Sequence, residues 1–136
     1  MKIIGLDNKE YDWKPSGSSE LDNRSKLHNE VKSVLREIFP YDVILEEVEL
    51  IGTKRRSGKN LTADFFIPNR NLIVEAHGAQ HYSYTHHFYG NRLNFHKAIA
   101  RDQQKKQWCL QNGISFVELS YKDKPDIWRQ TIADRR

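Results

Sequence analysis

The chain has 136 residues, of which 38% are hydrophobic, and a formal charge of +4. That length suits one domain with a modest core. The cationic surplus favours a polyanionic partner, although 18 acidic residues make the distribution of charge more informative than its sum. The single cysteine, Cys109, excludes an internal disulfide and a cysteine-based zinc site, which fits a reducing compartment. The sequence has no apolar run long enough to span a membrane and no signal-peptide pattern, so we expect a cytoplasmic or nucleoid-associated protein.

Residues 1–23 are predicted to form an N-terminal arm ahead of a domain that spans residues 24–136. Ile3 and Ile4 indicate a short strand, and residues 15–19 have the composition of a linker. The arm either packs on its own domain or a second subunit, or contacts nucleic acid through aromatic and basic side chains. Those side chains are Tyr11, Trp13 and Lys14.

Residues 24–39 are predicted to form a helix, because apolar residues recur at helical spacing and Pro40 ends it. Glu30 borders the apolar stripe, where it either faces a site or makes a salt bridge at the surface. We expect His28 and Lys32 on the solvated face of this helix.

Residues 43–51 alternate loosely and are predicted to form a strand with one wet face, which would carry its glutamates. A flexible basic loop follows over residues 52–60. Its four cations are either solvated or in contact with phosphate, and their position beside an acidic strand favours phosphate contact. They are Lys54, Arg55, Arg56 and Lys59.

Residues 61–82 are predicted to contain a hairpin of two strands joined by turn residues at 68–71. Two acids interrupt its apolar runs, Asp64 in the first strand and Glu75 at the end of the second. A carboxylate in a buried strand is costly unless it is paired or holds a metal, and a hairpin can bring its residues side by side. Oxygen ligands of this kind suit Mg²⁺. Polar residues for proton transfer and hydrogen bonding follow at once: His77, Gln80 and His81.

Residues 93–112 are predicted to form a second long helix, which Gly113 ends. Asp102 falls on its inward face and needs a partner there, either a histidine or metal, or a basic neighbour on the helix. Lys105 and Lys106, one turn later, are candidates for phosphate contacts. The inward face is expected to run through Phe95, Ala98, Ile99, Asp102, Lys106 and Cys109, with Leu110 alongside.

A buried strand at residues 114–119 follows that helix. Together with the strand at residues 72–76 it completes a strand–helix–strand crossover, which predicts that the two strands are parallel and adjacent. The aromatic segment at residues 82–92 is interpreted as a lid or a stacking surface for bases. A short helix over residues 126–133 is expected to pack inward through Ile127, Trp128 and Ile132.

The acidic hairpin resembles the core of the PD-(D/E)XK nucleases. In that family an Asp and a later Glu bind metal, and a Lys stands two residues after the Glu. Asp64 and Glu75 match the two acids, whereas Ala63 replaces the preceding Pro and His77 replaces the Lys. The missing Lys puts the family's standard mechanism in question more than the metal site.

The His-Gly pair at residues 77–78 and the Arg-Asp pair at residues 101–102 are similar to the very-short-patch-repair endonucleases and the related EDxHD homing endonucleases. The second group is named after Glu, Asp, His and Asp in chain order, which Glu30, Asp64, His77 or His81, and Asp102 fill. The resemblance covers roughly residues 24–120. It implies a single α/β domain of the restriction-endonuclease type, with a central mixed β-sheet flanked by helices.

The resemblance also implies a metal-dependent endonuclease that hydrolyses phosphodiester bonds in double-stranded DNA, in the form of a small free-standing homing endonuclease. Asp64, Glu75 and the carbonyl of Ala76 would bind Mg²⁺, with Mn²⁺ as a substitute. His77 or His81 would act as the base, since imidazole ordinarily titrates near neutral pH. Asp102 would orient it, and Glu30 would hold a second histidine or a water. DNA contacts are expected from the basic loop with Gln80, Lys105 and Lys106.

Rival interpretations stay open at this point. The chain could be a mismatch- or structure-specific nicking nuclease, a catalytically inactive DNA-binding module, or a protein that binds or cuts RNA. A double-strand break through one site needs two passes or two subunits, and a symmetric homodimer is the plain solution.

Overall fold

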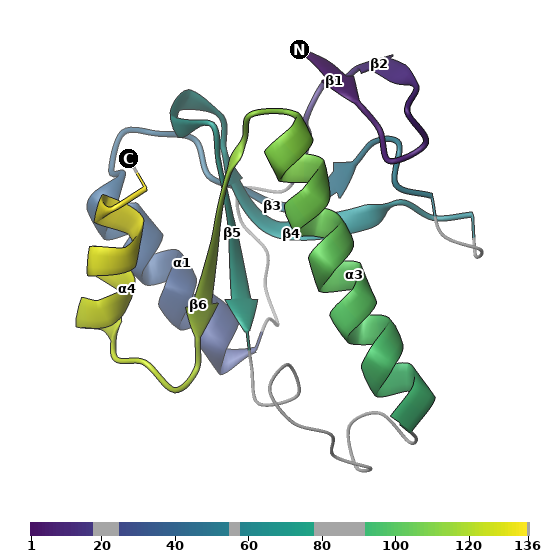
Figure 1. Ribbon diagram of the computed structural model, residues 1–136. Coiled ribbons are helices and arrows are strands. Elements are labelled where there is room, and N and C mark those ends of the chain that lie inside the picture. The colour runs from purple at the N-terminus through teal and green to yellow at the C-terminus, as the bar shows by residue number, and fades with distance from the viewer. Residues whose placement is uncertain (18–24, 55–57, 78–91, 136) are drawn as a thin grey trace.

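The computed structural model describes residues 1–17, 25–54, 58–77 and 92–135, with only the backbone described for 92–95. The chain forms two small groups of strands and three helices within these ranges (Figure 1). In chain order the elements are β1 (Lys2–Ile4), β2 (Glu10–Asp12), α1 (Lys26–Ile38), β3 (Leu45–Leu50), β4 (Leu61–Ile67), the 3-10 turn η1 (Pro68–Arg70), β5 (Leu72–His77), α3 (Arg92–Gln111), β6 (Ser115–Ser120) and α4 (Pro125–Ala133).

The central sheet has the strand order β3-β4-β5-β6. Neighbouring strands from β3 to β5 are antiparallel, whereas β6 runs parallel to β5, with Val74 opposite Val117. The hairpin turns through η1, and Asn71 takes the left-handed conformation (φ 50°) that ends it. The predicted mixed sheet, the hairpin and the parallel crossover are therefore confirmed.

Helices cover both faces of this sheet (Figure 1). On one face, α1 and α4 close a core cluster around Leu35, Phe65 and Trp128. On the other face, α3 closes a second cluster around Phe66 and Trp108. The domain therefore has three layers, and the ends of the middle strands lie between helices. No helix in the described ranges is long and apolar enough to cross a membrane.

The β1–β2 hairpin belongs to the second cluster. Ile3 and Trp13 are buried there, and the Trp13 ring lies 5.0 Å from the rings of both Phe66 and Trp108. Of the two interpretations of the arm, the structure supports packing on its own domain. The other interpretation, in which Trp13 contacts nucleic acid, does not fit the structure, because its ring is inside the core and its indole N–H donates to the Glu49 carbonyl at 3.1 Å.

Gly52 gives a test of this packing. Its backbone is left-handed (φ 82°), and a Cβ there would meet the Gly5 Cα at 2.6 Å. We expect Gly52→Ala to lower the free energy of unfolding by about 2–4 kcal/mol, from strain plus displacement of the hairpin. Gly58 has a similar φ of 83°, but a Cβ added there would meet no atom within 4 Å, so Gly58→Ala should cost only about 1 kcal/mol. Urea unfolding measures both, and equal losses would contradict the close approach.

Candidate active site

The strand alternation changes phase at Asp64. Ala63 packs in the second core cluster and Phe65 in the first, although residues two apart in a regular strand share a face. Across the sheet, Glu47 on β3 has a left-handed backbone (φ 54°). Glu46 accordingly faces α1, while Val48 faces the opposite cluster. Asp64 therefore sits at an irregularity of the sheet, where backbone groups are available to side chains.

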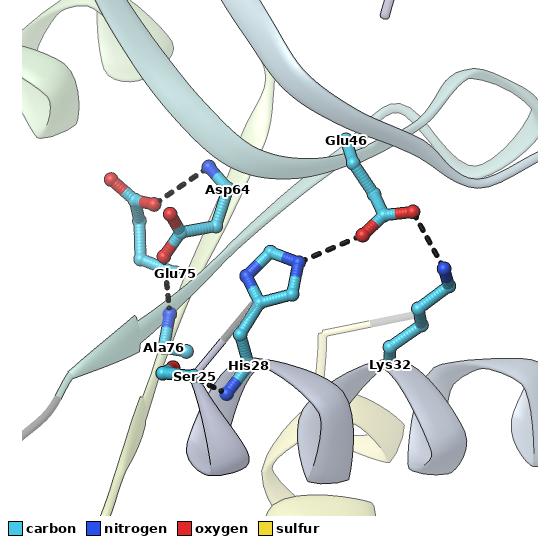
Figure 2. Close-up of polar contacts among 7 residues, drawn as sticks. All are labelled: Ser25, His28, Lys32, Glu46, Asp64, Glu75 and Ala76. Carbon is cyan, nitrogen blue, oxygen red and sulfur yellow. Dashed lines mark hydrogen bonds and ion pairs between the residues drawn. The ribbon is translucent and has the colours of Figure 1, made fainter. Parts of the chain in front are cut away.

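The Glu75 and Asp64 carboxylates each accept a backbone N–H of the opposite strand at this irregularity (Figure 2). The Asp64 N–H donates to Glu75 Oε2 at 2.9 Å, and the Ala76 N–H donates to Asp64 Oδ2 at 2.9 Å. The β4–β5 register is regular from Ile67↔Leu72 to Phe65↔Val74. Beyond Phe65 the two carboxylates accept the strand N–H groups in place of backbone carbonyls. The two acids therefore lie side by side across the hairpin, as predicted.

Lys105 reaches Glu75 from α3. Its Nζ lies 2.5 Å from Glu75 Oε1. Burial and the charge of Asp64 raise the pKa of Glu75 to about 8, although Lys105 opposes the shift. Burial by itself would lower the pKa of Lys105, but Glu75 outweighs it and the pKa is raised. The buried Glu75 carboxylate thus lies beside the half-buried Asp64 carboxylate and one cation, and a divalent cation would stabilise such a pair of acids.

The face of α3 that meets the sheet differs from the predicted one. Trp108 and Cys109 are buried, Lys105 points inward, and Lys106 and Leu110 are exposed. Lys105 was expected to contact phosphate, but here it pairs with Glu75. Burial and the charge of Glu75 raise the pKa of Cys109 to about 12, so this thiol is protonated and unreactive at neutral pH.

His77 ends β5 on the same face of the sheet as Glu75. It is buried, and its Nδ1 lies 3.2 Å from Glu118 Oε2. Glu118 stands opposite Glu75 in the parallel register and also pairs with Lys106. Glu118 was not predicted as a site residue; the predicted parallel pairing of its strand with the strand of Glu75 was the signal that could have found it.

A second charged cluster lies on the opposite face of the sheet, against α1 (Figure 2). The side chain of Glu46 is completely buried; His28 Nε2 lies 2.8 Å from its Oε1 and Lys32 Nζ lies 2.9 Å from its Oε2. The expected solvated positions of all three are therefore wrong. Helical spacing from Val31 and Leu35 places residue 28 inward, and this signal was in the sequence. Strand alternation from Val48 would place residue 46 on the face of Val48, so the position of Glu46 against α1, next to the left-handed Glu47, had no such signal.

Glu30 lies away from the acidic pair. It is exposed on α1, two residues or about 200° around the helix from His28, and its carboxylate lies 3.8 Å from Lys26. The structure thus favours the surface salt bridge for Glu30. Asp102 is half-buried on α3 and acts electrostatically on Lys105.

The other predicted residues divide into two groups. Lys54 and Lys59 are exposed. Four predicted site residues lie outside the described residues: the DNA contacts Arg55, Arg56 and Gln80, and the alternative base His81. The expected lid at residues 82–92 lies almost wholly outside them as well. Ile127, expected to pack inward from α4, is exposed instead, while Trp128 and Ile132 are buried as predicted.

The acidic pair offers oxygen ligands of the type Mg²⁺ takes. The N–H and C=O of one strand residue point to the same neighbouring strand, so the Ala76 carbonyl points with its N–H toward Asp64. Asp64, Glu75 and this carbonyl are oxygen donors of the kind that a hard divalent ion takes. No group of three or more His, Cys, Asp or Glu side chains suited to a metal occurs among the described residues; an ion bound here would take its other ligands from water or substrate.

Comparisons with known proteins give viral relatives. The chain is 39% identical over 75 residues to uncharacterized protein 307L of Invertebrate iridescent virus 6, covering 51% of this chain and 38% of that protein. It is 35% identical over 68 residues to uncharacterized protein 033L of Invertebrate iridescent virus 3, covering 50% and 35%. It is 32% identical over 69 residues to uncharacterized protein 094L of Frog virus 3, covering 50% and 44%. The matches thus span less than half the length of these relatives. No protein-family model and no solved structure matches the chain.

Proposed function

We propose that the chain is a metal-dependent endonuclease that hydrolyses phosphodiester bonds in double-stranded DNA. One observation carries the proposal: Asp64 and Glu75 meet at an interrupted β-ladder, and the pKa of Glu75 is raised to about 8 by burial and by Asp64. Two neighbouring carboxylates, one of them buried, repel each other when both are ionised and are favourable around a cation. A net charge of +4 is consistent with a polyanionic substrate.

Each neighbouring side chain has a role in this proposal. A bound Mg²⁺ would supply Lewis-acid polarisation of the scissile phosphate. Lys105, once Glu75 holds the cation, is free to place its ammonium against a phosphate oxygen. His77 is oriented by Glu118 and would hydrogen-bond the phosphate or the water. Lys54, Lys59 and the cations between them would bind the flanking phosphates.

One observation favours a rival function. The Lys105 ammonium already contacts Glu75, and a fold that binds DNA without cutting it would keep this contact permanently. The two functions differ in metal binding: a nuclease must exchange the Lys105–Glu75 contact for a cation, whereas an inactive module keeps it.

Plasmid digestion tests the proposal directly. The purified chain is incubated with supercoiled plasmid and mixed genomic DNA in Mg²⁺, Mn²⁺ or EDTA, and Mn²⁺ binding is measured by calorimetry. We expect cutting with either metal and none in EDTA. The ratio of nicked to linear product, and competition with mismatched duplex and single-stranded RNA, then separate the nuclease types. Salt-sensitive DNA binding without Mn²⁺ binding or cutting would favour the inactive module.

The basic loop gives a further prediction. Neutralising Lys54, Arg55, Arg56 and Lys59 to Gln should weaken DNA binding and flatten its salt dependence, because each phosphate contact adds about 0.9 to the slope of log K against log salt. We expect the slope to fall by about 2 to 4 in fluorescence anisotropy titrations. Lys122→Gln/Lys124→Gln, at exposed positions before α4, is the control; it removes two cations where the loop variant removes four, so the variants are compared per removed charge. An equal change per removed charge in both variants would exclude a specific role for the loop.

A further inference from the structure

The cluster of His28, Glu46 and Lys32 has no role in the chemistry described so far. Glu46 is fully buried, and a buried carboxylate needs compensation. Lys32 alone could balance its charge from 2.9 Å. Burial by itself raises the pKa of Glu46, but the hydrogen bonds from Lys32 and His28 outweigh it and lower that pKa. Glu46 is therefore a carboxylate at neutral pH, and His28 is bonded to a fixed negative charge.

The cluster adjoins the acidic pair. Glu46 pairs with Phe65 in the β3–β4 register, and the His28 ring stacks on the Phe65 ring with centroids 4.4 Å apart. Phe65 directly follows Asp64. In Figure 2 the His28 ring lies between the Glu46 carboxylate and the side on which Asp64 and Ala76 are drawn. His28 thus lies on the α1 side of the residue that follows Asp64, on the face opposite Lys105.

The hydrogen bond to Glu46 fixes the tautomer of His28. A carboxylate only accepts hydrogen bonds, so Nε2 of a neutral ring must carry the proton that it donates to Glu46 Oε1 at 2.8 Å. Nδ1 is then left with its lone pair. Among the residues that the structure describes, no group hydrogen-bonds this nitrogen, and in Figure 2 it points toward the side of Asp64 and Ala76. The ring is held in place by Phe65, and the Ser25 hydroxyl caps α1 at the His28 N–H.

We propose that His28 is the general base of the hydrolysis, with Glu46 and Lys32 as positioning residues. This inference rests on the proposed nuclease function. A water gives its proton to His28 Nδ1 as its oxygen forms the new bond to phosphorus. The bond from phosphorus to the leaving oxygen breaks, and that oxygen takes a proton from solvent. The imidazolium is stabilised by Glu46, as in other base–carboxylate pairs, and then releases its proton to solvent.

The alternative is that His28 only anchors α1 to the sheet. His28→Gln separates the two, because the glutamine amide can still donate to Glu46 but has no nitrogen that accepts a proton. If His28 only anchors α1, the glutamine should keep that function and the cleavage rate should be unchanged. If His28 is the base, the glutamine cannot replace it and the rate should fall. Glu46→Gln is the second variant, since it keeps the volume but no longer enforces the tautomer. His96→Gln changes an exposed histidine of α3 and is the matched control.

The experiment measures four quantities for each protein: the single-turnover cleavage rate in Mg²⁺, Mn²⁺ affinity, DNA affinity in Ca²⁺, and the melting temperature. We expect the rate of His28→Gln to fall by about 100-fold or more, the usual contribution of a general base, and that of Glu46→Gln by about 10-fold or more. Both affinities should stay within about 3-fold of wild type, and His96→Gln should match wild type throughout.

The outcomes are separable. A His28→Gln variant that cuts within about 3-fold of wild type would overturn the inference and leave the nuclease intact. If His28→Gln does not fold, a folded Glu46→Gln variant decides: a wild-type rate overturns the inference, and a reduced rate at unchanged affinities supports it. A wild-type protein that neither binds Mn²⁺ nor cuts removes the proposed function and this inference with it.

Discussion

Asp64→Asn should abolish cleavage and leave the fold intact. The asparagine amide oxygen can accept the Ala76 N–H as Asp64 Oδ2 does at 2.9 Å, so the strand ends stay together. The variant loses one of two carboxylates around the cation, and metal-based charge stabilisation contributes several kcal/mol to such reactions. A loss of that size lowers the rate by about a thousand-fold or more. Single-turnover cleavage of a labelled duplex in Mg²⁺ measures it.

The control for this variant is Asp123→Asn, which removes the same charge at an exposed position after β6. It should cut at the wild-type rate. DNA affinity of Asp64→Asn in EDTA should stay within a few fold of wild type, because the basic loop is unchanged. Undiminished cleavage by Asp64→Asn would exclude the proposed metal site, whatever the DNA affinity of the variant.

The sheet was predictable because its signals are local. Apolar runs of strand length, Pro and Asn at the hairpin turn, and Gly113 after a helical pattern each fix an element without knowledge of its neighbours. The parallel pairing of β5 and β6 followed from the length of the crossover. The pairing of Asp64 with Glu75 followed in turn from the hairpin, so both residues and their juxtaposition were accessible from the sequence.

The rest of the site depends on the rotation of helices, which sequence patterns define less well. A rotation of α3 by one residue makes Lys105 the inward residue in place of Lys106. The apolar stripe that should define the rotation of this helix was weak, because charged and amide side chains interrupt it. The left-handed backbone at Glu47 and the phase change at Asp64 break the strand alternation, and neither has a composition signal. These irregularities occur where the carboxylates meet, and departures from local rules are common at functional sites such as the one proposed for this pair.

The metal-free protein should lose stability as pH rises through neutrality. Below about pH 4.5 Glu75 is protonated in both the folded and the unfolded chain. Between there and about pH 8 the unfolded chain has lost a proton that the folded protein keeps, because burial and Asp64 raise the pKa of Glu75 to about 8. The free energy of unfolding therefore falls with rising pH across this window, by roughly 1 kcal/mol per pH unit, and levels off above it.

Urea unfolding in EDTA from pH 5 to pH 9 measures this slope. Glu75→Gln/Lys105→Met is the control, since it removes the titrating acid and its cation together and should show a flatter profile. Adding Mn²⁺ should restore the stability of the wild type at pH 8 by about 3 kcal/mol at a hundredfold excess over Kd, and should do little for Asp64→Asn. A wild-type slope equal to that of the double variant would mean that Glu75 stays ionised in the folded protein. Asp64 and Glu75 would then be balanced by Lys105 alone, and the electrostatic argument for a cation at this site would fail.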